Sequence, residues 1–123
     1  MSIVIVGAGD VGLYLAQILS KEEHNIILID KDSKKLQQAS NLLDVATRTG
    51  SGTDWQLLDD LLELSPTLFI ALTDDDETNL VACSIAKNLG YPRTIARVHD
   101  NRYLNRTRLD FSRIFEVDYF ISP

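Results

Sequence analysis

The sequence has few of the features that mark secreted or membrane proteins. Cys83 is its only cysteine, so no internal disulfide can form, and a small buried packing residue is a better interpretation than a reactive or metal-binding thiol. No apolar segment approaches the roughly 18 residues of a spanning helix. No basic, then hydrophobic leader precedes the first apolar run at residues 3–6. These absences predict a cytoplasmic protein.

Positive charge is also scarce. The net charge is -6 and the isoelectric point is near 4.7, which argues against nonspecific binding to nucleic acid or to an anionic membrane. With 123 residues, 45% of them hydrophobic, the chain fits one ordinary globular domain. A second, catalytic domain does not fit, so the sequence predicts a single acidic domain with no nucleic-acid partner.

Residues 3–30 have the pattern of a nucleotide-binding unit. The apolar run at 3–6 leads into the glycine motif Gly7, Gly9 and Gly12, then a helical pattern, a second apolar run and Asp30. The first glycine permits a tight turn, the second lets backbone approach a pyrophosphate, and the third lets helix and strand pack closely. This context predicts a dinucleotide site; the alternative is a glycine-rich turn without a ligand.

Two features of this unit indicate the kind of ligand. The helix after the glycines begins with unpaired N–H groups at the positive end of its dipole, which favours a phosphate there. Asp30 follows the glycine motif at about the 20 residues expected for a carboxylate that holds ribose hydroxyls. Because an acid repels a 2′-phosphate, we predict NAD rather than NADP, although an acid that ends a strand is often only solvated.

The rest of the chain alternates between helical and strand patterns. Val11, Leu15, Ile18 and Leu19 predict the inward face of the first helix. Asp32 is expected to cap a second helix that reaches about residue 42, and Thr53 with Gln56 forms the capping box of a third. Further strands are expected at 45–48, 68–72, 94–98 and 117–121.

The acidic run 74–77 follows the fourth strand. Carboxylates at a helix start cap N–H groups, and we favour capping over a metal site because no histidine or cysteine joins the run. The helix that follows is expected to turn Val81, Ile85 and Leu89 inward and to stop at Gly90. Asp100 is expected to cap a last helix that reaches about residue 109.

This alternation predicts an α/β fold: a Rossmann-like, doubly wound, mainly parallel six-stranded sheet with helices on both faces. Ligands of such sheets bind beyond the carboxyl ends of the strands, where the strand order reverses. The segments expected there are residues 7–12, Asp30, 50–53, 73–75 and 97–100.

Charges are unevenly placed along the chain. Residues 49–86 contain eight acids and neither lysine nor arginine, whereas residues 93–113 contain six arginines. Such a pattern is typical of solvated faces. It suits equally well a contact between copies in which an acidic helix meets a basic segment of its neighbour.

Several segments together resemble the regulator-of-potassium-conductance (RCK) family, and most closely the N-terminal nucleotide-binding domain of TrkA-type subunits of bacterial Trk potassium uptake. They are residues 3–12, 30–32, 50–53, 72–79 and 95–98. The glycine motif is shared with many dehydrogenases, but the Thr-Asp-Asp-Asp-Glu-Thr-Asn run at 73–79, followed by Ala-Arg on the fifth strand, is more specific. The resemblance covers essentially the whole chain.

The resemblance implies a role for each part of the site. The phosphates would be held by Gly7, Ala8, Gly9, Asp10, Val11 and Gly12, the adenosine ribose by Asp30 with Lys31 beside it, and the adenine side by Gly52 and Thr53. Thr73 and Asp74 would border the distal half of the ligand, and Arg97 would meet phosphate. The ligand would be NAD or NADH, or alternatively ATP, ADP or AMP.

The resemblance also implies an assembly. Such domains form homo-oligomers, dimers that build into a ring beneath a membrane-embedded Trk-type potassium channel subunit, and ligand-dependent shape changes gate transport. This would place the chain in the cytoplasm, at the inner face of the membrane. The family's usual small C-terminal domain is absent, so residues 1–123 are expected to be one nucleotide-binding domain from a longer protein.

The alternative function is that of an NAD-dependent oxidoreductase fragment. His99 follows the fifth strand on the ligand edge and could act as an acid or base, although a loop histidine is more often solvated. None of the four tyrosines has a lysine four residues later. Regulation requires only binding and a shape change, so we predict no catalytic residue and no enzyme.

Overall fold

Six strands form one sheet in the computed structural model, which describes residues 1–123. They are β1 (Ser2–Val6), β2 (Asn25–Asp30), β3 (Ala46–Thr49), β4 (Pro66–Ala71), β5 (Thr94–Arg97) and β6 (Tyr119–Ile121). All neighbouring strands are parallel, in the order β3-β2-β1-β4-β5-β6. The strand order reverses between β1 and β4, which places the expected ligand crevice beyond their carboxyl ends. The predicted doubly wound sheet is confirmed.

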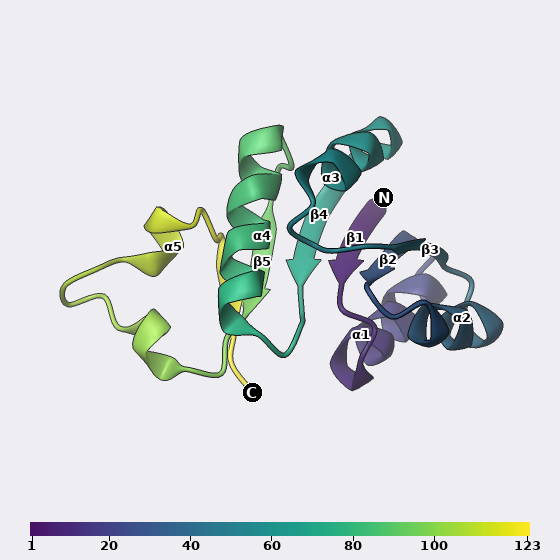
Figure 1. The fold of residues 1–123 in the computed structure, drawn as a ribbon, viewed down its shortest axis with the longest axis horizontal. Coiled ribbons are helices and arrows are strands. Elements are labelled where there is room, and N and C mark those ends of the chain that lie inside the picture. Colours follow the sequence, from purple (N-terminus) through teal and green to yellow (C-terminus); the bar gives the residue numbers. More distant parts are fainter.

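Helices connect the strands and cover both faces of the sheet (Figure 1). They are α1 (Asp10–Lys21), α2 (Ser33–Leu42), α3 (Trp55–Leu61), α4 (Asp76–Leu89) and the short α5 (Phe111–Ile114), with 3₁₀ turns η1 (Leu62–Leu64) and η2 (Asn101–Leu104). The helices α1 and α2 pack on one face, and α3 and α4 pack on the other. None of these helices is long and apolar enough to cross a membrane.

The central strands are apolar on both sides because both of their faces are covered. Val4 and Val6 of β1 belong to the core under α3 and α4. Ile3 and Ile5, which alternate with them, belong to the core under α1 and α2. The carboxyl end of β1 is therefore fixed from both sides, and the turn that follows starts from a rigid strand.

Two helices turn only part of the predicted face inward: Leu15 and Leu19 of α1 and Ile85 and Leu89 of α4 pack against the core as predicted. In α1 the buried residues are Gly12 and Ala16, whereas Val11 and Ile18 are 39% and 38% exposed. In α4, Val81 is 40% exposed, and the buried face includes Ala82 and Ala86 with the fully buried, free Cys83. The prediction that Val11, Ile18 and Val81 face inward is wrong, because small residues let these helices approach the sheet closely. The packing role predicted for Cys83 is confirmed.

One predicted helix start and one predicted helix end also differ from the structure. The cap of α3 is Asp54, whose carboxylate accepts from the N–H groups of residues 56 and 57, so Thr53 is not the cap. Asp100 does cap a helix, but only the one-turn η2. The chain leaves that helix where the Asn105 side chain accepts from the N–H of Thr107, a local bond that competes with helix formation. The predicted helix to residue 109 is therefore wrong.

Candidate functional site

The glycine turn contains two structural glycines and one that faces open space. Gly7 has φ +106°, and a β-carbon there would lie 3.0 Å from the Leu72 backbone. A β-carbon on Gly12 would lie 1.8 Å from the Gly7 carbonyl oxygen, so this position must be glycine for α1 to pack on the turn. A β-carbon on Gly9 would meet nothing within 4 Å. Gly9 is thus the position where a side chain would enter the crevice.

The amino end of α1 differs from those of the other α-helices. Aspartates cap α2, α3, α4 and α5, and each accepts from backbone N–H groups of the first turn. The N-cap of α1 is Gly9, with no side-chain cap hydrogen bond. Its first-turn N–H groups, at the positive end of the helix dipole, are left for an external acceptor such as a phosphate.

Asp30 links the end of β2 to the glycine turn. Its Oδ2 accepts from the Ala8 N–H at 2.8 Å, and its Oδ1 accepts from the Asp32 N–H at 2.8 Å. A carboxylate oxygen can accept more than one hydrogen bond. Asp30 therefore holds the turn in place and keeps the capacity to accept from a ligand hydroxyl.

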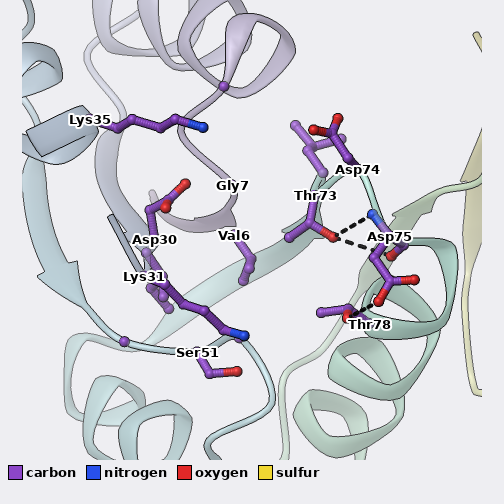
Figure 2. A pocket seen from close by; sticks show the side chains of 15 residues that line it. Val6, Gly7, Asp30, Lys31, Lys35, Ser51, Thr73, Asp74, Asp75 and Thr78 are labelled. Carbon is purple, nitrogen blue, oxygen red and sulfur yellow. Dashed lines mark hydrogen bonds between the residues drawn. The ribbon is translucent and has the colours of Figure 1, made fainter. Parts of the chain in front are cut away.

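A first hollow of about 310 Å³ opens between two walls at the carboxyl edge of the sheet. Figure 2 shows Asp30, Lys31, Lys35 and Ser51 on one side, facing Thr73, Asp74, Asp75 and Thr78 on the other. Gly52 also lines this hollow, and a β-carbon there would approach the Val6 side chain to 2.4 Å. This side of the crevice has the carboxylate, the glycine backbone and the hydroxyls suited to a nucleoside.

A second hollow of about 420 Å³ lies beside the amino end of α1. Its lining includes Ala8, Gly9, Asp10, Val11, Lys35, Gln38, Asp74 and Arg97. The Arg97 guanidinium lies 3.7 Å from the carboxylate of Asp74, and the arginine side chain is 14% exposed, whereas that of Asp74 is fully exposed. Gly9, Lys35, Leu72 and Asp74 line both hollows and form their common border.

A buried amide joins the two loops on the far side of the crevice. Asn79 of α4 is fully buried, and its Nδ2 donates to the carbonyl oxygens of Thr73 and Arg97. Its Oδ1 accepts from the N–H and the hydroxyl of Thr73. Asn79 thereby fixes the Thr73 backbone in the first hollow relative to the end of β5, which carries Arg97.

Asp76 makes a second connection from α4 to the segment after β5. Its carboxylate accepts from the N–H groups of His99 and Asp100 at 2.8 and 2.9 Å and lies 3.1 Å from the His99 Nδ1. Burial raises the pKa of Asp76, but the hydrogen bonds from His99 and Asp100 outweigh it and hold this pKa below its usual value. Two residues of the acidic run thus have structural roles: Asp75 caps α4, and Asp76 binds the segment after β5 to that helix.

The structure brings most of the predicted site residues together. Those lining one or both hollows are Gly7, Ala8, Gly9, Asp10, Val11, Asp30, Lys31, Gly52, Thr73, Asp74 and Arg97. Gly12 lines neither hollow and instead packs against the Gly7 carbonyl. Thr53 also lines neither hollow, but its hydroxyl lies 2.9 Å from the hydroxyl of Ser51, which lines the first hollow. Lys35 and Thr78 were missed. The position of Lys35, in the first turn of the helix that follows Asp30, is the signal that could have indicated it.

This fold, with its glycine turn and uncapped helix, defines a Rossmann-type nucleotide-binding domain. The model of the TrkA-N domain family matches residues 3–123. The chain belongs to the TrkA-N domain family.

Curated relatives match over the whole of this chain. The Trk system potassium uptake protein TrkA of Halomonas elongata is 37% identical over 124 residues, and a TrkA homolog of Methanothermobacter thermautotrophicus is 32% identical over 123 residues. Each alignment covers 100% of this chain, but 27% and 55% of the respective relative. The chain therefore spans only part of the length of these relatives.

Solved structures share the fold at lower sequence identity. The GsuK channel bound to NAD superimposes with a TM-score of 0.83 at 18% identity, over 98% of this chain and 21% of the channel chain. The Kef C-terminal domain of Shewanella denitrificans in its AMP-bound form gives a TM-score of 0.75 at 19% identity, over 100% of this chain and 72% of that one.

Proposed function

We propose that this chain is the nucleotide-binding regulatory domain of a Trk-type potassium uptake system. It binds NAD(H) or an adenine nucleotide in the crevice between β1 and β4 and transmits the occupancy of that crevice to a membrane channel subunit. The observation that carries this proposal is the amino end of α1, which lacks a side-chain cap and lies beside an open Gly9. Membership of the TrkA-N family and the names of the relatives support the potassium transport role.

The proposed binding mode follows the two hollows. The first hollow takes the adenosine, with Asp30 accepting from the ribose hydroxyls and the loop at 50–52 beneath the base. The pyrophosphate lies at the shared border, against the N–H groups of residues 10–12. The rest of the ligand enters the second hollow, toward Arg97. The GsuK channel has been solved with NAD bound and the Kef domain with AMP bound, which supports both ligand classes.

The test of this mode is Gly9→Val. A valine there projects into open space, so the variant is expected to fold, as judged by its thermal unfolding, and to lose most of its affinity for NAD and ATP in titration calorimetry. Gln17→Val, at an exposed position of α1 outside both hollows, is the control and should bind like the parent. Unchanged NAD and ATP affinity in folded Gly9→Val would refute the proposed site.

The signal is proposed to pass through Arg97. A ligand with a terminal phosphate competes with Asp74 for the guanidinium, whereas NAD places a nicotinamide ribose in the same hollow. Ligands shift an assembly only through such differential contacts. Arg97→Ala should therefore weaken ATP binding more than NAD binding and abolish any ATP-dependent change in small-angle scattering. Equal loss of both ligands would contradict this route.

The domain is proposed to work in the cytoplasm, as a homo-oligomer beneath its channel partner. Val81 of α4 is exposed, and so are Leu104, Leu109 and Ile114 in the arginine-rich segment at residues 101–115. This combination of apolar and basic groups supports contact with an acidic face of a second copy. Light scattering at low salt should give a molar mass above the 13.8 kDa of the monomer.

The oxidoreductase alternative gains no support from the position of His99. Its ring is held at Asp76, and it lines neither of the hollows beside the glycine turn. A hydride-transfer assay with NADH and small carbonyl substrates distinguishes the two functions, because turnover would count for the enzyme.

A further inference from the structure

Lys35 is the one cation that lines both hollows of the crevice. Figure 2 shows its side chain extending from α2 toward the glycine turn, on the same wall as Asp30, whereas the Lys31 side chain extends toward Ser51. Lys35 takes part in none of the ion pairs of the structure. Its ammonium is therefore an uncommitted positive charge at the border where the phosphate chain of a ligand would cross.

The placement of this lysine runs against the local electrostatics of its helix. The first turn of α2 contains Lys34 and Lys35 and no acid. Cations near a helix amino end are unfavourable because they meet the positive end of the helix dipole. By contrast, the first turn of α4 contains Asp76 and Glu77. The Asp32 carboxylate caps this helix, but neither lysine takes part in an ion pair of the structure. A basic first turn with no ion-pair partner breaks a local rule, which is typical of a functional position.

The charge balance of the crevice supplies the reason for a cation there. Asp10, Asp30, Asp74 and Asp75 line the two hollows, against Lys31, Lys35 and Arg97. Arg97 already forms an ion pair with Asp74. An anionic ligand thus enters a crevice in which carboxylates outnumber cations, and each added phosphate charge is repelled unless a free cation lies at the phosphate path.

We propose that Lys35 determines the ligand specificity of the crevice by compensating the charge of the phosphate chain. This inference rests on the proposed nucleotide-binding function and adds to it a residue and a rule for ligand choice. The α1 amides bind phosphate of any chain length, and the ammonium of Lys35 adds affinity that grows with the number of phosphate charges. A lysine is suited to this because it acts as a mobile point charge on a flexible stem. The crevice then ranks adenine nucleotides by charge.

The test compares Lys35→Met with Lys34→Met. Both variants remove one positive charge from the same helical turn, but Lys34 lines neither hollow. Titration calorimetry with adenosine, AMP, ADP and ATP should show no change for adenosine in Lys35→Met and a loss that grows along the series to roughly 10- to 100-fold for ATP. Lys34→Met should bind all four ligands like the parent, and Lys35→Arg should retain most of the ATP affinity.

Salt dependence provides a second readout that a purely structural role would not change. The parent's ATP affinity should fall more steeply with added salt than that of Lys35→Met. Equal losses for adenosine and ATP, or parent-like ATP affinity in Lys35→Met, would overturn the role of Lys35 and leave the proposed site intact. A parent protein that binds none of the ligands would refute the proposed function and this inference with it.

Discussion

The helices α1 and α4 begin on the same edge of the sheet, on either side of the crevice, and their amino ends are built differently. The first turn of α4 is tied to the protein by Asp75, which caps it, and by Asp76 and Asn79, which bind the loops after β5 and β4. The amino end of α1 has no side-chain cap: its N-cap is Gly9, and Gly12 of its first turn packs against the Gly7 backbone. One helix start is satisfied internally, and the other is not.

The difference shows how one fold separates rigidity from binding. The polar groups at the start of α4 satisfy each other and fix two loops, so they hold one wall of the crevice in place. The unsatisfied N–H groups of α1 carry the positive end of a dipole into the space that this wall bounds. Exchanging properties between the two helix starts is therefore the direct way to test the comparison.

The largest effect is expected at Gly12. Gly12→Ala places a β-carbon 1.8 Å from the Gly7 carbonyl oxygen, and α1 cannot move away without losing its packing on β1. The expected loss in unfolding free energy is about 3 kcal/mol or more, at the upper end of overpacking effects. Gly9→Ala, three residues earlier, should cost less than about 1 kcal/mol. Urea denaturation of both variants measures the difference, and similar losses would contradict the division of roles.

Asn79→Leu should have the next largest effect. It removes the partner of the Thr73 N–H, hydroxyl and carbonyl and of the Arg97 carbonyl, in a fully buried position. The expected cost is about 2 to 3 kcal/mol, because buried polar groups lose their hydrogen bonds. Asn88→Leu, on the exposed side of the same helix, is the control and should cost less than about 1 kcal/mol. A smaller loss for Asn79→Leu than for Asn88→Leu would argue against the tether.

Transferring a cap from one helix start to the other should have opposite effects on stability and binding. Asp75→Ala removes the cap of α4 and should cost about 1 kcal/mol of unfolding free energy. Gly9→Asp gives α1 a cap in a backbone conformation, φ -77° and ψ -167°, that an aspartate adopts readily. It should change stability by only a few tenths of a kcal/mol and abolish ATP binding in calorimetry, because a carboxylate occupies the phosphate position. Parent-like ATP binding in Gly9→Asp would show that phosphate does not lie there.

The sequence was sufficient to predict the sheet and the glycine turn because both depend on local patterns. Continuous apolar runs indicate buried parallel strands, and the glycine spacing fixes the turn that follows the first of them. The inward faces of α1 and α4 were predicted only in part because Gly12, Ala16 and Ala82 carry little apolar signal. Their burial depends on how close each helix lies to the sheet, and periodicity does not report that distance.

The missed site residues depend on contacts between distant segments. In the sequence, Asn79 is one polar residue among others in a helical pattern. It is buried and hydrogen-bonded to the Arg97 carbonyl only because the end of β5 packs beside it. In the sequence, Lys35 cannot be told from an ordinary surface lysine. Only the fold shows that it lines the same hollow as the glycine turn. The cap of α3 is Asp54 and not Thr53, because aspartate is the stronger N-cap of these two adjacent residues and a capping-box pattern fixes a helix start only to within a residue or two.

The smallest predicted effect is the pH dependence of the stability that the Asp76 carboxylate contributes at the start of α4. Its folded-state pKa is lowered, so the unfolded chain, with an ordinary pKa near 3.9, binds this proton first as the pH falls. The stabilisation is therefore complete above about pH 5 and is lost as the pH falls through the unfolded and then the folded pKa. Asp76→Asn should be less stable than the parent at pH 7, and the gap should narrow below pH 4.

Urea unfolding of the parent and Asp76→Asn between pH 7 and pH 3 measures this gap. The same pair in a His99→Gln background removes the imidazole from the comparison, so that the backbone N–H donors of residues 99 and 100 alone are tested. A gap that stays constant down to pH 3 would mean that the Asp76 carboxylate is not preferentially ionised in the folded state. The start of α4 would then be held by Asp75 and Asn79 without it, and the contrast with α1 would rest on those two residues.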